Sequence, residues 1–288
     1  MIRSLNTGVS GIQQFQEEMD VIGNNIANVD TAGYKAARVS FADSFSETLR
    51  GSTGANGTSS GTSAMQIGLG VGTAAINNVY TQGGLARTGV QTDLAISGEG
   101  FFIVRDSVNG ADFATRAGDF RVDANGYLIT NIGLRVQGFS DPALSTRGDV
   151  LIDTQGRPAT ADPAATFVSF AIDREGIVKV RLSDGTEYVR GQVLLQRFSD
   201  PQALVKEGFN LYSGIDVAGP LGGGSAPTSA VPGTNGLGRV ESGALELSNV
   251  DLANEFSKMI TTQRAFQASA RIITTSDEML QELVNLKR

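Results

Sequence analysis

The chain has 288 residues and a net charge of −7, and it contains no His, Cys or Trp. Without His or Cys, the sequence excludes a Ser-His-Asp triad, a Cys-His nucleophile, a thiol redox centre and the usual zinc sites. The acidic balance argues against nucleic-acid binding, because such an interface needs a basic surface to neutralise phosphates. We therefore expect no enzymatic activity, no cofactor and no metal site.

Apolar runs in the sequence are short. The densest strand-like run, residues 101–104, has four residues, well below the ~18 that a membrane helix needs. Residues 1–6 show neither an unbroken apolar core nor a small-residue cleavage site. We expect no membrane insertion and no cleaved signal peptide.

An amphipathic helix is predicted at the N-terminal end, over residues 1–31. Its apolar residues recur every seven positions, with Val9 and Ile22 beside the main line, which consists of Leu5, Ile12, Met19 and Ile26. Gly8, Gly11 and Gly23 each weaken such a helix by about 1 kcal/mol relative to Ala, so it is marginal alone. Residues 28–33 are typical of a helix stop followed by a turn.

The middle of the chain is rich in turn residues and predicts a β body over 76–232, between linkers at 32–75 and 233–244. Residues 51–64 are all small and predict a flexible loop. Strands are indicated at 92–97, 101–105, 167–172 and 177–182, with a hairpin turn at 123–126. In residues 178–182 apolar and charged side chains alternate, which is typical of a half-buried antiparallel sheet.

The C-terminal segment, 245–288, predicts a second and longer helix, because no Gly or Pro occurs from Ala244 to Arg288. Its main apolar line repeats every seven residues and consists of Leu252, Met259, Phe266, Ile273 and Leu280. A second, mixed line is expected four residues after each of these and consists of Phe256, Gln263, Ala270, Asp277 and Val284. Ser248 and Asn249 are the expected N-caps.

These segments predict an α+β fold. The N- and C-terminal helices pair as a coiled coil, and a mainly antiparallel β domain is inserted between them. Ordering the backbone costs ~1–2 kcal/mol for every residue of a helix. An apolar seam has one side chain in seven residues and gains only ~1.5–3 kcal/mol for each one that is buried. The total cost therefore exceeds what one seam supplies. We infer that the helices order mainly when copies associate. The alternative is a self-sufficient coiled-coil stalk on a monomer.

Both ends resemble the bacterial flagellar rod and hook axial proteins. At the N-terminal end the resemblance lies in residues 20–28 and 31–35, and its motif positions are Asn24, Asn25, Asn28, Thr31, Gly33 and Tyr34. At the C-terminal end it lies in residues 248–252, 259–267 and 274–280. The body matches as well, at residues 93–102, 115–120 and 210–212.

Within this family, residues 41–45 and 278–288 are most similar to the hook protein. The resemblance therefore implies a structural subunit of the tubular hook, the flexible joint that transmits motor torque to the filament. The alternative within the family is the distal rod, or drive shaft, which agrees with the short chain and with the long segment after Arg50. An alternative of another class is a coiled-coil surface adhesin.

The resemblance also implies partners and location. It implies a helical homopolymer that contacts neighbouring rod and hook-filament junction proteins, the hook cap and the type III export apparatus. The location is the extracellular hook, or the periplasm for a rod. Phe41 and Phe45 are candidates for an export signal. The expected self-assembly interface consists of Leu5, Val9, Ile12, Met19, Ile22, Ile26, Leu252, Phe256, Met259, Phe266, Ile273 and Leu280.

Overall fold

The computed structural model describes residues 2–54, 60–158, 161–221 and 230–286. The chain forms two compact units. The helical unit consists of Met1–Ala27, Ala36–Val79 and Val250–Arg288, and the β unit consists of Asn28–Lys35 and Tyr80–Asn249. Residues 36–79, most of which were expected to be a linker, therefore belong with the helices.

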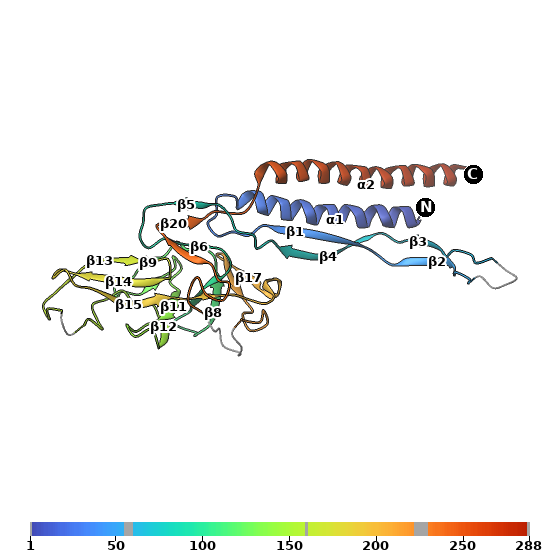
Figure 1. The fold of residues 1–288 in the computed structure, drawn as a ribbon. Coiled ribbons are helices and arrows are strands. Elements are labelled where there is room, and N and C mark those ends of the chain that lie inside the picture. Colours follow the sequence, from blue (N-terminus) through green and yellow to red (C-terminus); the bar gives the residue numbers. More distant parts are fainter. Residues whose placement is uncertain (1, 55–59, 159–160, 222–229, 287–288) are drawn as a thin grey trace. The chain divides into compact units, whose positions relative to one another are not determined.

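Two antiparallel helices, α1 (Ile2–Ala27) and α2 (Leu252–Leu286), lie side by side in the helical unit (Figure 1). Their antiparallel direction follows from their contacts, because Ser4 faces Ser276 at one end and Asn25 faces Glu255 at the other. Two terminal helices and mainly antiparallel strands agree with the predicted α+β class.

The ends of both helices lie close to the signals predicted from the sequence. α1 ends at Ala27 because residues 28–33 form the expected turn, in which Gly33 has a φ of 69°. α2 begins at Leu252, after residues 244–246, which form a strand. Asp251 caps this helix, since its Oδ1 accepts hydrogen bonds from the backbone N–H groups of Ala253 (3.0 Å) and Asn254 (3.4 Å). The N-caps expected at Ser248 and Asn249 were thus placed a few residues too early.

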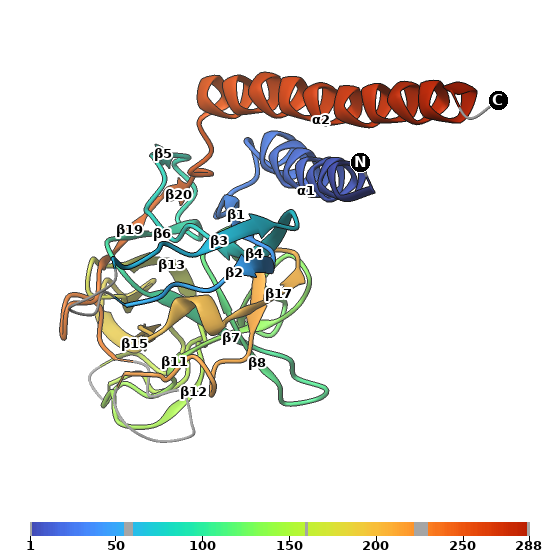
Figure 2. The same ribbon diagram turned by 90° about the vertical axis from the view of Figure 1, so that its right-hand side faces the viewer.

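A two-stranded β ribbon runs beside α1 in the helical unit, as both views show (Figures 1 and 2). Strand β1 (Ala37–Asp43) pairs with β4 (Val71–Asn78), and further along the same hairpin β2 (Ser46–Arg50) pairs with β3 (Met65–Gly68). Thr53 and Thr62 form one more bridge toward the tip. Part of the predicted flexible loop, residues 55–59, lies outside the described residues.

The β unit is built from antiparallel strands. Its main sheet has the order β13-β14-β15-β11-β7-β8-β18-β17, and β9, β10, β12 and β16 branch from this path. Two short pairs, β19–β6 and β20–β5, lie outside the sheet. The strands are β5 (Leu85–Arg87), β6 (Leu94–Ser97), β7 (Phe101–Arg105), β8 (Asp112–Thr115), β9 (Arg121–Val122), β10 (Leu128–Ile129), β11 (Arg135–Phe139), β12 (Arg147–Asp149), β13 (Phe167–Ile172), β14 (Ile177–Leu182), β15 (Glu187–Val193), β16 (Leu195–Gln196), β17 (Val205–Gly208), β18 (Leu211–Ser213), β19 (Arg239–Ser242) and β20 (Ala244–Glu246).

The apolar core lies within the β unit. One cluster is centred on fully buried side chains such as Phe102, Val104 and Val180. A second, aromatic cluster contains Phe101, Phe198 and Tyr212, whose rings meet at centroid distances of 5.6–5.9 Å. The alternation predicted for 178–182 is confirmed, because the apolar positions of β14 are buried and the charged ones are exposed.

Candidate functional site

The surface between α1 and α2 is lined by small and polar residues. On each helix these residues recur every seven positions, and they face one another in the pairs Ser4–Ser276, Gly11–Ser269, Glu18–Thr262 and Asn25–Glu255. We call these eight residues the polar seam. Thr262 donates a hydrogen bond of 3.0 Å to Glu18, and Asn25 donates one of 3.1 Å to Glu255. The seam therefore fixes direction and register by hydrogen bonding and close approach rather than by apolar burial.

Glycine makes the close approach possible. A Cβ atom built on Gly11 would lie 3.1 Å from the Ser269 hydroxyl, and one built on Gly8 would lie 3.1 Å from Ile273. At Gly23 nothing lies within 4 Å of such an atom. Two of the three glycines that weaken α1 therefore serve the contact with α2.

The predicted apolar lines flank the polar seam. On α1, Leu5, Ile12, Met19 and Ile26 are half-buried and Ile22 is buried, whereas Val9 is exposed. On α2, Met259, Phe266, Ile273 and Leu280 are half-buried. The residues of α2 that turn toward α1 come three positions after the main line, at Glu255, Thr262, Ser269 and Ser276. The second line predicted from the sequence, four positions after the main line, lies beside them. Leu252 and Phe256 are exposed in the single chain.

The helical unit carries many exposed apolar side chains that the sequence interpretation did not single out. On α2 they are Ile260, Ile272, Met279, Leu283 and Leu286, and Val284 of the predicted second line is exposed as well. On the ribbon they are Leu49, Met65, Ile67, Leu69 and Ile76. Exposed apolar side chains in such numbers on one helix and one ribbon are typical of interaction surfaces.

The two candidate export residues behave differently. The ring of Phe41, on β1, contacts Phe15 of α1 edge-on at a centroid distance of 6.2 Å. Phe45, between β1 and β2, is 86% exposed. Phe41 therefore contributes to packing of the ribbon on α1, and Phe45 does not share that contact.

Asn25, one of the motif residues, joins three segments of the helical unit. Its side chain is buried; Nδ2 donates to the Ala37 carbonyl (2.8 Å) and to Glu255, while Oδ1 accepts from the Ala37 N–H (3.0 Å). Lys258 donates a 2.7 Å hydrogen bond to the other oxygen of Glu255. Asn25 thus ties the end of α1 to the start of the ribbon and to the first turn of α2. Asn24, by contrast, is exposed.

The remaining motif residues form the turn that enters the β unit. Thr31 donates from its N–H to the Asn28 carbonyl and from its hydroxyl to the Asn28 side chain, both at 3.2 Å. Gly33 is required, because a Cβ atom there would lie 2.5 Å from the backbone nitrogen of Ala117. Tyr34 is buried, and the ammonium of Lys206 lies 4.6 Å from its ring centre.

A buried ionic cluster follows directly on this turn. Lys35 Nζ donates 2.7 Å hydrogen bonds to Glu246 Oε1 and to the Thr81 carbonyl. Glu246 also accepts from the Gly83 N–H (2.9 Å) and from Arg116 (3.2 Å). Burial lowers the pKa of Lys35, the Glu246 carboxylate opposes that shift, and the positive charge of Arg116 adds to it. We call Lys35, Arg116 and Glu246 the ionic lock.

The ionic lock lies close in sequence to ends of the β unit's segments. The chain changes unit after residues 27, 35, 79 and 249, and Lys35, Thr81 and Glu246 lie at or close to the last three of these points. Asn249 adds a 3.0 Å hydrogen bond to the Thr81 hydroxyl. Lys35 and Arg116 belong to segments quoted from the sequence, 31–35 and 115–120, but their pairing was not predicted. Glu246 was not singled out, because nothing local in its segment distinguishes it from a surface charge.

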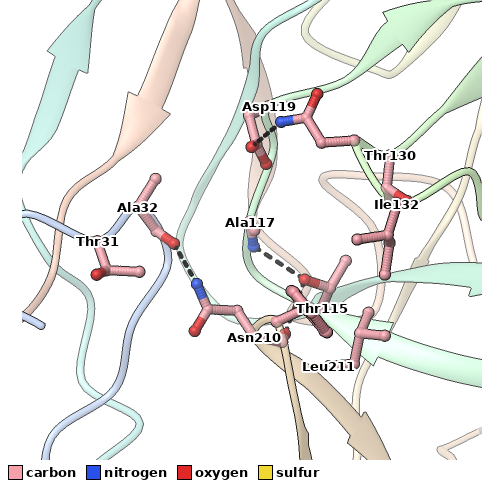
Figure 3. Close-up of a pocket in the computed structure, with 11 residues that line it drawn as sticks. Thr31, Ala32, Thr115, Ala117, Asp119, Thr130, Ile132, Asn210 and Leu211 are labelled. Carbon is pink, nitrogen blue, oxygen red and sulfur yellow. Dashed lines mark hydrogen bonds between the residues drawn. The ribbon is translucent and has the colours of Figure 1, made fainter. Parts of the chain in front are cut away.

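A cavity of about 250 Å³ lies where the motif turn meets the sheet (Figure 3). Asn210 donates a 2.8 Å hydrogen bond to the Ala32 carbonyl, and the Thr115 hydroxyl accepts one of 3.1 Å from the Ala117 N–H. Asp119, the titratable residue in the wall, accepts a hydrogen bond from Asn131. A single hydrogen-bonded carboxylate does not form an acid–base pair. The hydrogen bond from Asn210 to Ala32 anchors the motif turn on the β unit.

Groups of acidic or metal-ligating residues that could hold a metal ion are absent from the part of the chain that the structure describes. In the same described residues, neither helix is long and apolar enough to cross a membrane.

Family comparisons match the chain at both ends and in the middle. Residues 5–35 match the flagella basal body rod protein family, residues 95–180 the flagellar hook protein FlgE/F/G D1 domain, and residues 241–286 the flagellar basal body rod FlgEFG protein C-terminal family. The flagellar basal-body rod protein FlgG of Bacillus subtilis (strain 168) is 41% identical over 288 residues, covering all of both chains. The chain belongs to the flagellar rod and hook protein family. This is a structural family, and the chain is not an enzyme.

Other relatives include both rod and hook proteins. The rod protein FlgG of Buchnera aphidicola subsp. Acyrthosiphon pisum (strain APS) is 35% identical, covering 99% of this chain and all of the relative. The hook protein FlgE of Borreliella burgdorferi (strain ATCC 35210 / DSM 4680 / CIP 102532 / B31) is 27% identical over an alignment of 449 residues that covers all of both chains. A crystal structure of Helicobacter pylori flagellar hook protein FlgE2 matches 64% of this chain and 47% of that chain, with 14% identity and a TM-score of 0.22, which adds nothing to the assignment.

Proposed function

We propose that this chain is the distal rod subunit of the flagellar basal body rather than the hook subunit that the sequence interpretation favoured. The observation that carries the proposal is the match in length. The Bacillus rod relative aligns over 288 residues without leaving either chain uncovered, whereas two hook relatives need alignments of 449 and 473 residues. The hook proteins therefore carry a large part for which this chain has no counterpart.

The similarity of residues 278–288 to the hook protein carries little weight between the two candidates, because the C-terminal family that matches residues 241–286 includes both rod and hook proteins. The length of the chain and the long segment after Arg50 also agree with a distal rod protein. The hook remains the second candidate, supported by its full-length alignment at 27% identity.

The rod subunit works by binding copies of itself. The exposed apolar surface of α2 and the ribbon supports this proposal, because burying it against neighbouring copies would supply the free energy that the polar seam lacks. The interface residues predicted on α1 and α2, from Leu5 to Leu280, are proposed to contact neighbouring copies. Neighbouring rod or hook proteins and the export apparatus remain the proposed partners, and the periplasmic part of the flagellum is the proposed location.

A negative-stain image of the purified full-length chain tests the proposal. Straight rods are expected for a drive shaft, because a rigid polymer transmits torque without bending. Curved tubes would favour the hook subunit instead. Dispersed particles at every concentration tested would contradict self-assembly and would favour the coiled-coil adhesin.

The export role of Phe41 and Phe45 is also a proposal. Because Phe45 is exposed and Phe41 contacts Phe15, the two alanine variants separate signal from packing. If the pair is an export signal, Phe41→Ala and Phe45→Ala both lower the secreted amount, while the purified variants still polymerise. Normal secretion of both variants, with a weakened polymer for Phe41→Ala alone, would leave packing as the role.

A further inference from the structure

Four Asn-Gly pairs occur in the sequence, and three of them lie in turns of the β unit: Asn109-Gly110, Asn125-Gly126 and Asn235-Gly236. The fourth, Asn56-Gly57, lies outside the described residues. In such a pair the backbone nitrogen of Gly can attack the side-chain carbonyl carbon of Asn, because Gly has no side chain to hinder the approach. The three asparagines in the turns are all exposed, so access to solvent does not distinguish them.

In two of these turns the attacking nitrogen is already hydrogen-bonded. The N–H of Gly110 donates to the Asp106 carbonyl, and the N–H of Gly126 donates to the Asp123 carbonyl, both at 2.9 Å. The side-chain amide of each preceding asparagine also donates to the carboxylate of the same aspartate, at 2.9 and 3.4 Å. These hydrogen bonds must break before the nitrogen can attack, so the two turns protect their asparagines.

The turn of Asn235-Gly236 is built differently. It is closed by a 2.8 Å hydrogen bond from the Leu237 N–H to the Thr234 carbonyl, and its two central residues, Asn235 and Gly236, have φ values of 51° and 76°. Positive φ at both central positions is typical of a type I′ turn, whose closing hydrogen bond does not use the N–H of the second central residue. Among the residues that the structure describes, neither the Gly236 N–H nor the Asn235 side chain has a hydrogen-bond partner. Both reacting groups are therefore free.

Arg197 lies against this turn. A Cβ atom built on Gly236 would lie 2.9 Å from Nη1 of Arg197. The Arg197 side chain is 40% exposed, and its Nε lies 2.7 Å from Glu99 Oε2. A backbone nitrogen attacks as the anion that remains after it loses its proton, and a nearby positive charge stabilises both that anion and the oxyanion that follows. Arg197 is thus placed to favour the attack.

We propose that Asn235-Gly236 is a site of spontaneous modification, at which Asn235 becomes an aspartyl or isoaspartyl residue. The Gly236 nitrogen loses its proton and forms a bond to Cγ of Asn235. The bond between Cγ and the side-chain nitrogen then breaks, and this nitrogen takes up a proton and leaves as ammonia. Water opens the resulting succinimide ring at either carbonyl, so that one product keeps the original main chain and the other has one more main-chain carbon.

Either product places a new carboxylate on the turn beside Arg197, where Glu99 is the present partner. The change adds one negative charge to a chain with a net charge of −7. It needs only solvent water and is irreversible once ammonia has diffused away. The inference does not depend on whether the chain belongs to the rod or to the hook, or on self-assembly.

Peptide mass spectrometry of the folded full-length chain, incubated in mildly alkaline buffer, tests the proposal. Lys and Arg residues separate the three asparagines, so trypsin places them in three different peptides. Asn235 should be converted at least about fivefold faster than Asn109 and Asn125, because their glycines must first lose a hydrogen bond. The control is the same chain unfolded in guanidinium chloride, in which the three rates should converge. Equal or slower conversion of Asn235 in the folded chain, or the same rate differences in the unfolded chain, would overturn the proposal.

The role of Arg197 is tested by Arg197→Gln, which should slow conversion of Asn235 about threefold by removing the positive charge. Asn109 and Asn125 serve as internal references in the same sample, and their rates should not change. The matched control is Arg181→Gln, which removes the same charge from an exposed pair with Glu187 elsewhere in the β unit. It should leave the rate at Asn235 unaltered. A rate in Arg197→Gln that equals or exceeds that of the wild type would contradict the assistance by Arg197.

Discussion

The two units of this protein are built on opposite plans. The β unit buries a continuous apolar core that includes Leu94, Phe102 and Val193. Among the described residues of the helical unit, Ile22 is the one apolar side chain that is fully buried, and the other buried side chains are Asn25, Glu255, Thr262, Ser269 and Ser276. The helical unit, which lacks an apolar core, carries more of the large exposed apolar side chains than the β unit does, and they lie mainly on α2 and the ribbon.

This contrast separates stability from specificity. Burial of its apolar core stabilises the β unit without contacts from another chain. In the helical unit, hydrogen bonds between polar side chains contribute little net free energy, ~0.5–1.5 kcal/mol each, but they select one register of the helices. We infer that the helical unit is completed by other copies, whereas the β unit is complete in the single chain.

The largest effect is expected in the β unit, from loss of the central carboxylate of the ionic lock. Glu246→Leu leaves Lys35 and Arg116 buried without a counter-charge, which should lower the free energy of unfolding by about 3–5 kcal/mol. The loss is measured by urea denaturation, with unfolding monitored by the circular-dichroism signal of the β strands.

The matched control for this change is Glu241→Leu. Glu241 pairs with Arg174 at 3.4 Å on the surface of the same unit, and the exposed pair should contribute less than ~1 kcal/mol. Similar losses in the two variants would show that the lock is no more important than a surface ion pair.

A charge on the main apolar line of α2 should abolish assembly and spare the β unit. Phe266 is half-buried in the single chain, and Phe266→Asp would place a carboxylate where an apolar interface is proposed. Polymer yield by sedimentation should fall to background, while the melting transition of the β unit stays unchanged. Leu280→Asp should act in the same way.

Gln267→Asp is the control for this prediction, because residue 267 is an exposed polar neighbour on the same helix. It should polymerise normally. Normal polymers from Phe266→Asp would remove this face of α2 from the proposed interface.

The same contrast explains what the sequence could and could not predict. Apolar periodicity located both helices and the antiparallel strands β13 and β14, because periodicity reports directly on burial. It did not single out the residues of α2 that contact α1, which are Glu255, Thr262, Ser269 and Ser276, because they carry no apolar signal. Glu246 escaped notice for a related reason: its partners, Lys35 and Arg116, lie far away in the sequence.

A smaller effect is expected in how the free energy of unfolding of the β unit changes with pH. The pKa of Lys35 is lowered from 10.5 in the folded chain, mainly by burial. Between the lowered pKa and 10.5 the unfolded chain binds more protons than the folded one, so the free energy of unfolding rises as the pH rises through this window. Lys35→Met should remove that rise.

The measurement for Lys35 is a series of urea titrations at increasing pH, compared between the wild type and Lys35→Met. Burial raises the pKa of Tyr188 and Tyr212, which lowers stability as the pH passes the ordinary tyrosine pKa of ~10. The two chains share that loss, so it cancels in their difference. Parallel curves throughout would mean that Lys35 is not the group that titrates.

The smallest effect tests how closely the two helices approach, and it uses two glycines of α1. Gly23→Ala should stabilise α1 by about 1 kcal/mol, because Ala favours the helix and nothing lies within 4 Å of the added methyl group. At Gly11 the same methyl group would lie 3.1 Å from the Ser269 hydroxyl, so the intrinsic gain should be cancelled or reversed. Amide hydrogen exchange of α1 in the full-length chain measures both changes. If both variants slow exchange equally, the helices are further apart than the polar seam requires, and the register of the helical unit must be set by contacts with other copies instead.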